Sequence, residues 1–388
     1  MVNIAFTGGG TGGHIYPGLA AAAELKHLLA EGREFRLFWI GSAAGMDRKL
    51  VENAGIEFFG IPSGKLRRYF SIKNAADFFR VIAGFFAARK ILKKEKVRLL
   101  FSKGGFVSVP PCAAAASLGI SVYTHESDFS PGLATKINTR FVSRTGGKIF
   151  TAYSETIPFL PPLVRSSAAV SGNPVRAVFR CADAAKGRAF LGTGAEERIL
   201  LVLGGSQGAA EINNLVCAAL PEMVKVYTVV HQTGAGFKYG AGMEQYLTGE
   251  NSNSYKPYSY IAEEMPHVLA AAELVLGRSG AGTVWECAVL GKPMILVPLA
   301  GSGTRGDQIE NARYFEKAGA AQVLLGENVN PQALVCAVNF LADNIEERTV
   351  MAAASKKIGE TDGAAFIAGI LSHEINLIYG EKNESFHD

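Results

Sequence analysis

The sequence has few cysteines, little net charge and no long apolar run. Its five cysteines are scattered through apolar surroundings over 388 residues, and no two have the spacing of metal ligands. We therefore expect reduced core thiols in a cytoplasmic protein rather than a disulfide framework. A net charge of +4 is too small to indicate nucleic-acid binding, so no nucleic-acid partner is expected.

The chain also lacks the features of a membrane-spanning or secreted protein. No stretch of about 18 uncharged apolar residues occurs, so no transmembrane helix is expected. The nearest candidate, residues 109–123, is too short and contains prolines and a glycine. The N-terminus passes directly into an apolar strand pattern at residues 2–7, without the basic and apolar regions of a signal peptide.

Glycine and apolar residues are abundant, and the chain is long enough for two domains with substantial cores. A buried strand followed by a glycine loop and a helix occurs twice, at residues 2–19 and at residues 199–216. This repetition predicts an α/β protein with two Rossmann-like parallel-sheet domains in tandem. The turn, proline and arginine at residues 172–176 indicate the connection between them.

The second domain contains the most informative stretch, residues 278–298. Its glycine turn at 279–283 lets a ligand approach the backbone, and the helix that follows offers free N–H groups to an anion. Glu286, one turn inside that helix, can accept hydrogen bonds from a diol such as ribose. This pattern is typical of a nucleotide-sugar site, but an ordinary βαβ turn with a surface glutamate fits it equally well.

The first glycine loop resembles a dinucleotide site only in part. Gly8, Gly10 and Gly13 match the pattern G-x-G-x-x-G, but the second strand ends in Gly41 and not in the acidic residue that would hold a ribose. His14 stands where the loop turns into the helix. It is either a helix-start residue satisfied by the backbone or a catalytic group, and we favour catalysis.

Two further stretches carry polar or amphipathic signals. A short strand at 122–124 ends at residues 125–128, which place a histidine and two carboxylates at a crevice position, although Asp128 could instead cap the next helix. Residues 64–98 are basic, with phenylalanines at helical spacing. They form either a core-facing helix with solvated basic ends or a surface that associates with anionic lipid, and we favour the second reading.

Taken together, these motifs resemble the MurG family of bacterial transferases, in glycosyltransferase family 28. The resemblance follows the chain in order through residues 8–17, 103–105, 125–128, 131–132, 172–176, 204–209, 278–286, 293–298 and 307–320. It implies the GT-B fold, with two Rossmann-like domains facing across a cleft. The implied domains are an acceptor and membrane domain at 1–172, joined by a C-terminal helix at about 360–388, and a UDP-sugar domain at 173–359.

The resemblance also implies the activity. Family members move N-acetylglucosamine from UDP-N-acetylglucosamine to the C4 hydroxyl of the N-acetylmuramyl group of lipid I, the undecaprenyl-pyrophosphoryl muramyl peptide, with inversion. The product is lipid II, a precursor of peptidoglycan. The family works as a peripheral protein on the cytoplasmic face of the bacterial plasma membrane. Residues 64–98 lie where the family places its contact with the anionic membrane surface.

The family's residue roles transfer to matching positions of this chain. The resemblance places Thr11, Gly12 and Gly13 near the donor phosphates and the acceptor. Asp128 contacts either the donor sugar or the acceptor, and many members have asparagine there. The remaining donor contacts, from nucleotide to sugar, are Arg176, Ser206, Ile261 through its backbone, Ala281, Gly282, Thr283, Val284, Trp285, Glu286 and Gln308.

An inverting displacement needs a base for the attacking hydroxyl. His14 is the first candidate because an imidazole titrates near neutral pH, and Asp128 and Glu126 come next. No Asp-x-Asp pair occurs, so we expect neither a metal nor another cofactor. Three other functions stay open: a nicotinamide-dependent oxidoreductase, a non-catalytic membrane scaffold, and a glycolipid synthase with another acceptor.

Overall fold

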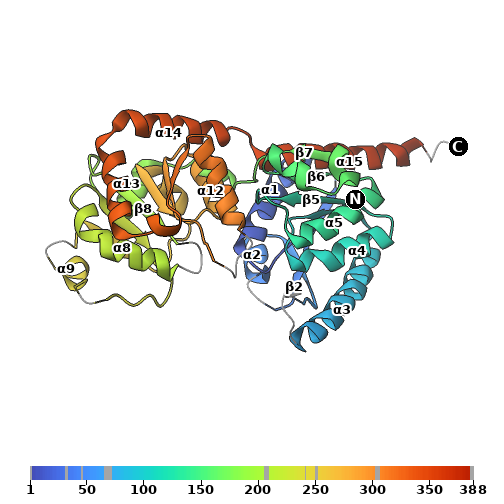
Figure 1. The fold of residues 1–388 in the computed structure, drawn as a ribbon. Coiled ribbons are helices and arrows are strands. Elements are labelled where there is room, and N and C mark those ends of the chain that lie inside the picture. The colour runs from blue at the N-terminus through green and yellow to red at the C-terminus, as the bar shows by residue number, and fades with distance from the viewer. Residues whose placement is uncertain are drawn as a thin grey trace. The chain divides into compact units, whose positions relative to one another are not determined.

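The computed structural model describes residues 2–30, 34–44, 47–64, 72–204, 209–240, 242–249, 252–301 and 306–384. The chain forms two compact units (Figure 1). Unit 1 comprises Met1–Arg176 together with Thr361–Asp388, and unit 2 comprises Ala177–Glu360. Each unit is built around a parallel sheet, which confirms the predicted α/β class with two Rossmann-like domains.

Unit 1 contains a seven-stranded sheet in the order β3-β2-β1-β4-β5-β6-β7. Its strands are β1 (Val2–Thr7), β2 (Phe35–Ser42), β3 (Glu57–Ile61), β4 (Val97–Ser102), β5 (Ser121–Glu126), β6 (Ile149–Thr151) and β7 (Ala168–Val170). The strand order reverses between β1 and β4, which pair directly. A reversal of this kind opens a crevice at the carboxyl ends of the two strands, where ligands bind in open α/β sheets.

The helices of unit 1 cover both faces of this sheet. They are α1 (Tyr16–Ala30), α2 (Asp47–Asn53), α3 (Ile72–Lys94), α4 (Val109–Ser117), α5 (Leu133–Thr145) and α15 (Gly363–Glu384), with 3-10 turns η1 (Gly12–His14), η2 (Phe106–Ser108), η3 (Ser154–Phe159) and η4 (Pro162–Ser167). The last helix, α15, packs beside α1. Its Ile367, Leu371 and Ile375 are buried in the same core as Phe6 and Trp39.

Unit 2 contains a six-stranded parallel sheet in the order β10-β9-β8-β11-β12-β13. Its strands are β8 (Ile199–Leu203), β9 (Thr228–Gln232), β10 (Tyr255–Tyr258), β11 (Leu274–Gly277), β12 (Met294–Leu296) and β13 (Ala321–Val323). Its helices are α6 (Ala177–Arg180), α7 (Ala184–Leu191), α8 (Ala210–Met223), α9 (Glu244–Leu247), α10 (Met265–Ala271), α11 (Ala281–Val289), α12 (Asp307–Lys317), α13 (Pro331–Asp343) and α14 (Ile345–Ile358), with the 3-10 turn η5 (Gly326–Asn328). Here the order reverses between β8 and β11.

Some local expectations need correction. β5 continues to Glu126, two residues further than expected, and α5 is capped by Gly132 and not by Asp128. The helix that was expected to follow the glycine turn at residues 279–283 begins at Ala281, within that turn. None of the helices in the described part of the chain is long and apolar enough to cross a bilayer.

Candidate active site

The glycine loop after β1 is held by protein groups. Trp39 Nε1 donates to the carbonyl of Gly8 at 3.0 Å. Asp47, only 1% exposed, accepts from the N–H of Gly10 at 3.1 Å and from that of Ser42 at 3.2 Å. A carboxylate that occupies the loop's N–H group repels a phosphate, so this geometry disfavours dinucleotide binding here. Asp47 could not be identified from the sequence, because its role depends on a contact with a distant loop.

The second glycine loop, after β4, packs against His14. Gly105 has a φ of +76°, and a Cβ there would lie 2.9 Å from His14 Cδ2 and 2.6 Å from the carbonyl oxygen of Gly9. A Cβ on Gly104 would lie 3.9 Å from His14 Nδ1. Gly105 is therefore needed for the close approach of this loop to the imidazole, whereas a Cβ on Gly104 would make an ordinary contact with it.

His14 ends η1 and is half-buried, while Thr11 and Gly13 beside it are exposed. The glycine loops of β1 and β4 and the histidine thus meet at the carboxyl ends of the two strands where the sheet order reverses. This arrangement places Thr11, Gly12 and Gly13 at the rim and the imidazole inside it.

The end of β5 lies next to this group, because β4 and β5 pair directly. Glu126 is 6% exposed, and its two oxygens accept from the backbone N–H groups of Asp128 at 3.0 Å and Gly132 at 2.9 Å. These bonds hold the loop that leads into α5. Asp128, at the start of this loop, is half-buried, whereas Glu126 is buried.

His125 also has a structural contact. It is 1% exposed, and its Nε2 donates to the carbonyl of Gly172 at 3.0 Å. Burial, and then the positive charge of Lys103, hold the pKa of His125 well below its ordinary value. A neutral imidazole with one nitrogen engaged ties β5 to the segment that leaves the sheet.

The segment that follows β7 ends at Arg176, the last residue of the N-terminal part of unit 1. Ser127 Oγ donates to Asn173 Oδ1 at 2.6 Å, which fixes its start. The Arg176 guanidinium lies 4.9 Å from the ring centroid of Tyr16, in cation–π contact at the start of α1. Arg176 therefore contacts Tyr16, which lies two residues after His14 in the chain.

Unit 2 offers a helix N-terminus at its own strand reversal. Gly280 caps α11 in an extended conformation with no side-chain cap. No described atom lies within 4 Å of the positions that a Cβ would take on Gly280 or Gly282. The space beside Gly280 and Gly282 is therefore open at the N-terminus of α11, an end of a helix that suits an anion.

Two of the predicted donor contacts in α11 have side chains that face the core. Val284 is 0% exposed and Trp285 is 3% exposed. The Trp285 ring meets Phe315 edge to face. Both can therefore offer a ligand only their backbone. Glu286 is half-buried and is the first charged side chain of the helix.

Gln308, at the start of α12, has a fixed carboxamide. Its backbone carbonyl accepts from Ser279 Oγ at 2.6 Å, and its Oε1 accepts from the N–H of Leu299 at 2.9 Å. Nε2 is therefore the atom able to donate to a ligand. Arg278, 8% exposed, braces the same edge by donating to the Val297 carbonyl at 3.0 Å.

Ile261 lies at the end of the neighbouring strands. Its side chain is 2% exposed, and its N–H donates to Gln232 Oε1 at 2.9 Å. The carboxamide oxygen of Gln232 thus occupies the position at this N–H group that a pyrimidine carbonyl oxygen would take. Ser206, the predicted contact in the loop after β8, lies outside the described residues.

Among the described residues, no three histidine, cysteine, aspartate or glutamate side chains are grouped to hold a metal ion.

The GT-B fold of glycosyltransferases consists of two α/β units with parallel sheets. In each unit here, a glycine-containing loop lies where the strand order reverses. The N-terminal domain model of glycosyltransferase family 28 matches residues 4–146, and its C-terminal domain model matches residues 199–366. The chain therefore belongs to glycosyltransferase family 28, and within it to the MurG family.

Named relatives support this assignment. A Treponema denticola protein is 47% identical over 99% of this chain and 100% of its own length. A Treponema pallidum protein is 45% identical over 94% of both chains. Each is named UDP-N-acetylglucosamine–N-acetylmuramyl-(pentapeptide) pyrophosphoryl-undecaprenol N-acetylglucosamine transferase. The crystal structure of Acinetobacter baumannii MurG has the same fold, with a TM-score of 0.71, 24% identity, and coverage of 95% of this chain and 99% of that one.

Proposed function

We propose that this protein transfers N-acetylglucosamine from UDP-N-acetylglucosamine to the C4 hydroxyl of the muramyl sugar of lipid I, which forms lipid II. The observation that carries the proposal is the full-length relative, 47% identical, which bears the name of this transferase. The geometry of each unit supplies groups that suit one part of the reaction.

The donor belongs to unit 2 in this proposal. Its pyrophosphate lies at the N-terminus of α11, where the N–H groups of Ala281, Gly282 and Thr283 stabilise negative charge. Glu286 accepts from the ribose hydroxyls, and the Nε2 of Gln308 donates to the sugar. The same N–H groups stabilise the charge that grows on UDP as the glycosidic bond breaks.

The proton acceptor belongs to unit 1. The acceptor hydroxyl oxygen attacks the anomeric carbon, the bond from that carbon to the phosphate oxygen breaks, and UDP leaves with the electron pair. His14 takes the hydroxyl proton, with Asp128 as the second candidate. A single displacement of this kind inverts the anomeric configuration.

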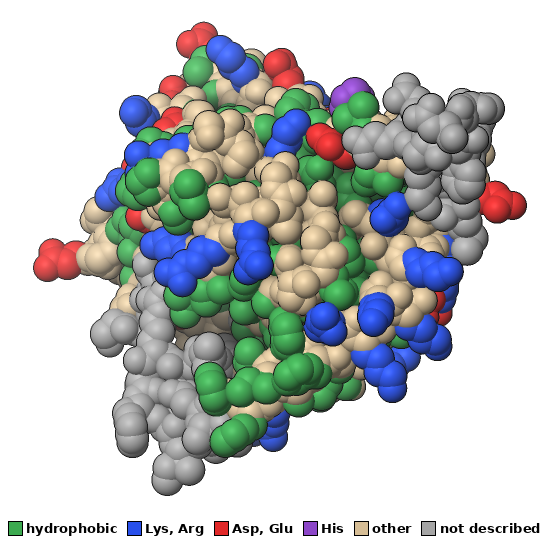
Figure 2. All heavy atoms as spheres, turned by 90° about the vertical axis from the view of Figure 1, so that its right-hand side faces the viewer, with side chains coloured by type: hydrophobic (Ala, Val, Ile, Leu, Met, Phe, Trp, Pro, Cys, Tyr) green, Lys and Arg blue, Asp and Glu red, His purple; other side chains and the backbone are tan. Residues whose placement is uncertain are grey.

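The lipid acceptor requires contact with a membrane, and α3 provides a suitable surface. Phe78, Phe79, Ile82 and Phe86 are 54%, 69%, 39% and 64% exposed. Their spacing places them along one side of the helix, while Ala88 and Leu92 are buried. Figure 2 shows hydrophobic side chains beside several lysines and arginines on this face. We propose that α3 rests on the anionic cytoplasmic surface of the membrane.

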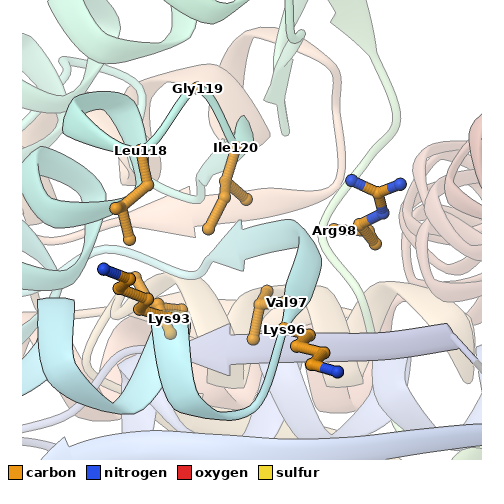
Figure 3. A pocket seen from close by; sticks show the side chains of 8 residues that line it. Lys93, Lys96, Val97, Arg98, Leu118, Gly119 and Ile120 are labelled. Carbon is orange, nitrogen blue, oxygen red and sulfur yellow. The ribbon is translucent and has the colours of Figure 1, made fainter.

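A basic hollow adjoins the C-terminal end of α3. It has a volume of about 200 Å³ and is lined by Lys93, Lys96 and Arg98 together with Leu118 and Ile120 (Figure 3). All three cations are exposed, and the lining contains no acidic side chain. They would meet lipid phosphates at the edge of the apolar contact.

The deciding experiment is transfer of labelled sugar from UDP-N-acetylglucosamine to a short-chain lipid I analogue, with UDP-glucose as the parallel donor. We expect a disaccharide product from the first donor only. Hydrolysis of the donor without transfer would reject lipid I as the acceptor. An absence of both reactions, together with no UDP binding, would reject the transferase altogether.

A further inference from the structure

A buried asparagine of α5 joins the two ends of the glycine loop after β4. Asn138 is 0% exposed, and so are the serines on either side of that loop, Ser102 at the end of β4 and Ser108 in η2. The carboxamide Nδ2 of Asn138 donates to Ser108 Oγ at 2.9 Å and to Ser102 Oγ at 3.2 Å. Since a carboxamide nitrogen carries two N–H donors, this one group can bond both hydroxyls at once.

The two serine hydroxyls are in turn bonded to the loop itself. Ser102 Oγ accepts from the N–H of Gly104 at 3.2 Å, and Ser108 Oγ donates to the carbonyl of Gly105 at 2.8 Å. Both glycines have a positive φ, +93° for Gly104 and +76° for Gly105. Because glycine has access to many backbone conformations and no side chain to pack, these hydrogen bonds restrict the loop to one of them.

The loop that Asn138 holds is the one that contacts His14. A Cβ on Gly105 would lie 2.9 Å from His14 Cδ2, so the backbone of Gly105 lies close to the imidazole ring. A movement of Gly105 would therefore change the space that the ring occupies. The contacts run from Asn138 through Ser108 and Gly105 to His14, and all of them lie within unit 1.

We propose that Asn138 is a positioning residue of the transfer reaction, which holds the glycine loop after β4 against His14 and so fixes the imidazole that takes the acceptor proton. This inference rests on the proposed function and adds a residue to it. Asn138 is fully buried, so it acts through the loop and not on a substrate.

The test compares Asn138→Leu, which removes both donors while keeping a side chain of similar size, with the matched control Thr145→Val. Thr145 also lies in α5, and its Oγ1 accepts from the N–H of Val122 at 3.0 Å and donates to the carbonyl of Phe141 at 2.9 Å. Val122 lies near the start of β5, so this connection joins α5 to the end of the sheet away from the glycine loop. Both variants should lower thermal stability, because each removes hydrogen bonds between α5 and its surroundings.

Steady-state transfer assays separate the two positions. Asn138→Leu should lower kcat about 10-fold with an unchanged KM for UDP-N-acetylglucosamine, because unit 2 binds the donor. Thr145→Val should keep the kcat of wild type. Wild-type kcat in Asn138→Leu, or an equal loss in Thr145→Val, would overturn the role.

A double variant tests the route of the effect. Ser108→Ala should lower kcat as Asn138→Leu does, and adding Asn138→Leu to Ser108→Ala should lower it little further. A second full loss in that background would overturn the route through Ser108. If Asn138→Leu does not fold, Ser108→Ala takes its place in each comparison with Thr145→Val, since it removes only a hydroxyl group.

Nuclear magnetic resonance of the histidine ring protons reports the surroundings of His14 without any substrate. The His14 signal is assigned by its absence from His14→Gln. It should shift in Asn138→Leu and in Ser108→Ala and stay in place in Thr145→Val. An unshifted signal in Asn138→Leu would overturn the proposal, and so would an equal shift in Thr145→Val.

Failure of the underlying function looks different. In that case wild type itself would form no disaccharide from the lipid I analogue, while the His14 signal would still report whether Asn138 holds the loop in place.

Discussion

At the scale of single residues, the space around a few glycines fixes the position of His14. A methyl group on Gly105 would meet His14 Cδ2 at 2.9 Å, at a φ of +76°. We predict that Gly105→Ala displaces the imidazole and lowers kcat at least 10-fold. Steady-state transfer assays, with the donor Kd measured in parallel, test this, because donor binding in unit 2 should be unchanged.

Gly119→Ala is the matched control. Gly119 has a similar φ of +69°, but no atom lies within 4 Å of its added Cβ. Both variants place alanine at a positive φ, which costs about 1–2 kcal/mol, but only Gly105→Ala also brings its Cβ to 2.6 Å from the Gly9 carbonyl oxygen, so Gly105→Ala should lose more stability than Gly119→Ala. Equal activity in the two variants would contradict the role given to the contact between Gly105 and His14.

A buried histidine in unit 2 should make stability depend on pH. His231 is 0% exposed and bonds Tyr255 Oη and Asn213 Oδ1, each at 3.0 Å. Burial lowers its pKa to about 3, so only the unfolded chain takes up a proton between pH 6.5 and 3. Its contribution is complete above pH 6.5 and falls with acidification, by about 1.4 kcal/mol at pH 5.5.

Thermal unfolding of wild type and His231→Gln over this range tests the expectation. The variant should be less stable at pH 7.5, and the gap should narrow on acidification. If the stabilities of wild type and variant changed in parallel with pH, a group other than His231 would be responsible for the pH dependence.

Only some residues of the candidate site could be predicted from the sequence. His14 and Glu286 could be selected because they follow recognisable glycine loops, whereas Gln308 was selected through the family resemblance. The hydrogen bonds from Gly10 and Ser42 to Asp47 could not be predicted, since they depend on a contact between distant loops. Val284 and Trp285 were grouped with their neighbours as donor contacts, and their burial shows that the rotation of α11 decides which positions of a motif face outward.

At the scale of elements, the N-terminus of α11 is expected to hold the donor pyrophosphate. Gly280 has a φ of −63°, and no described atom lies within 4 Å of its added Cβ. Alanine therefore fits the free protein but occupies the space of the ligand. We predict that Gly280→Ala raises the Kd for UDP at least 10-fold, as measured by calorimetry, while the protein remains folded.

Gly369→Ala, in α15, provides the control. Its added Cβ also meets no atom within 4 Å, and it lies in unit 1. UDP affinity should equal that of wild type. Unchanged affinity in Gly280→Ala as well would place the pyrophosphate elsewhere.

Elements with strong local signals could be predicted closely. β1 and β8 match the expected bounds, because each is an apolar run that ends at a glycine loop. β13 was missed, since Ala321–Val323 is three residues long with a central glutamine. Its strand character comes from pairing with β12, and this long-range contact has no local signature.

At the scale of the whole molecule, α3 should govern attachment to membranes. We predict that Phe79→Ser with Phe86→Ser weakens binding to phosphatidylglycerol vesicles at least 10-fold, because two exposed apolar side chains no longer enter the lipid. Vesicle co-sedimentation measures this. Activity on a water-soluble acceptor analogue should be unchanged.

Leu163→Ser is the matched control for this surface. Leu163 is 75% exposed on the same unit but lies in η4 and not in α3. It should bind vesicles as wild type does. A similar loss in both variants would indicate non-specific apolar contact.

The placement of α15 has a consequence for the order in which the protein matures on the ribosome. Unit 2 is one continuous segment, whereas the core of unit 1 needs Ile367 and Leu371 from the end of the chain. Unit 2 can therefore reach its native state while the first 176 residues still wait for their last helix. At roughly 5–20 residues per second that delay lasts on the order of ten seconds. During it, an incomplete apolar surface on α1 is open to chaperones.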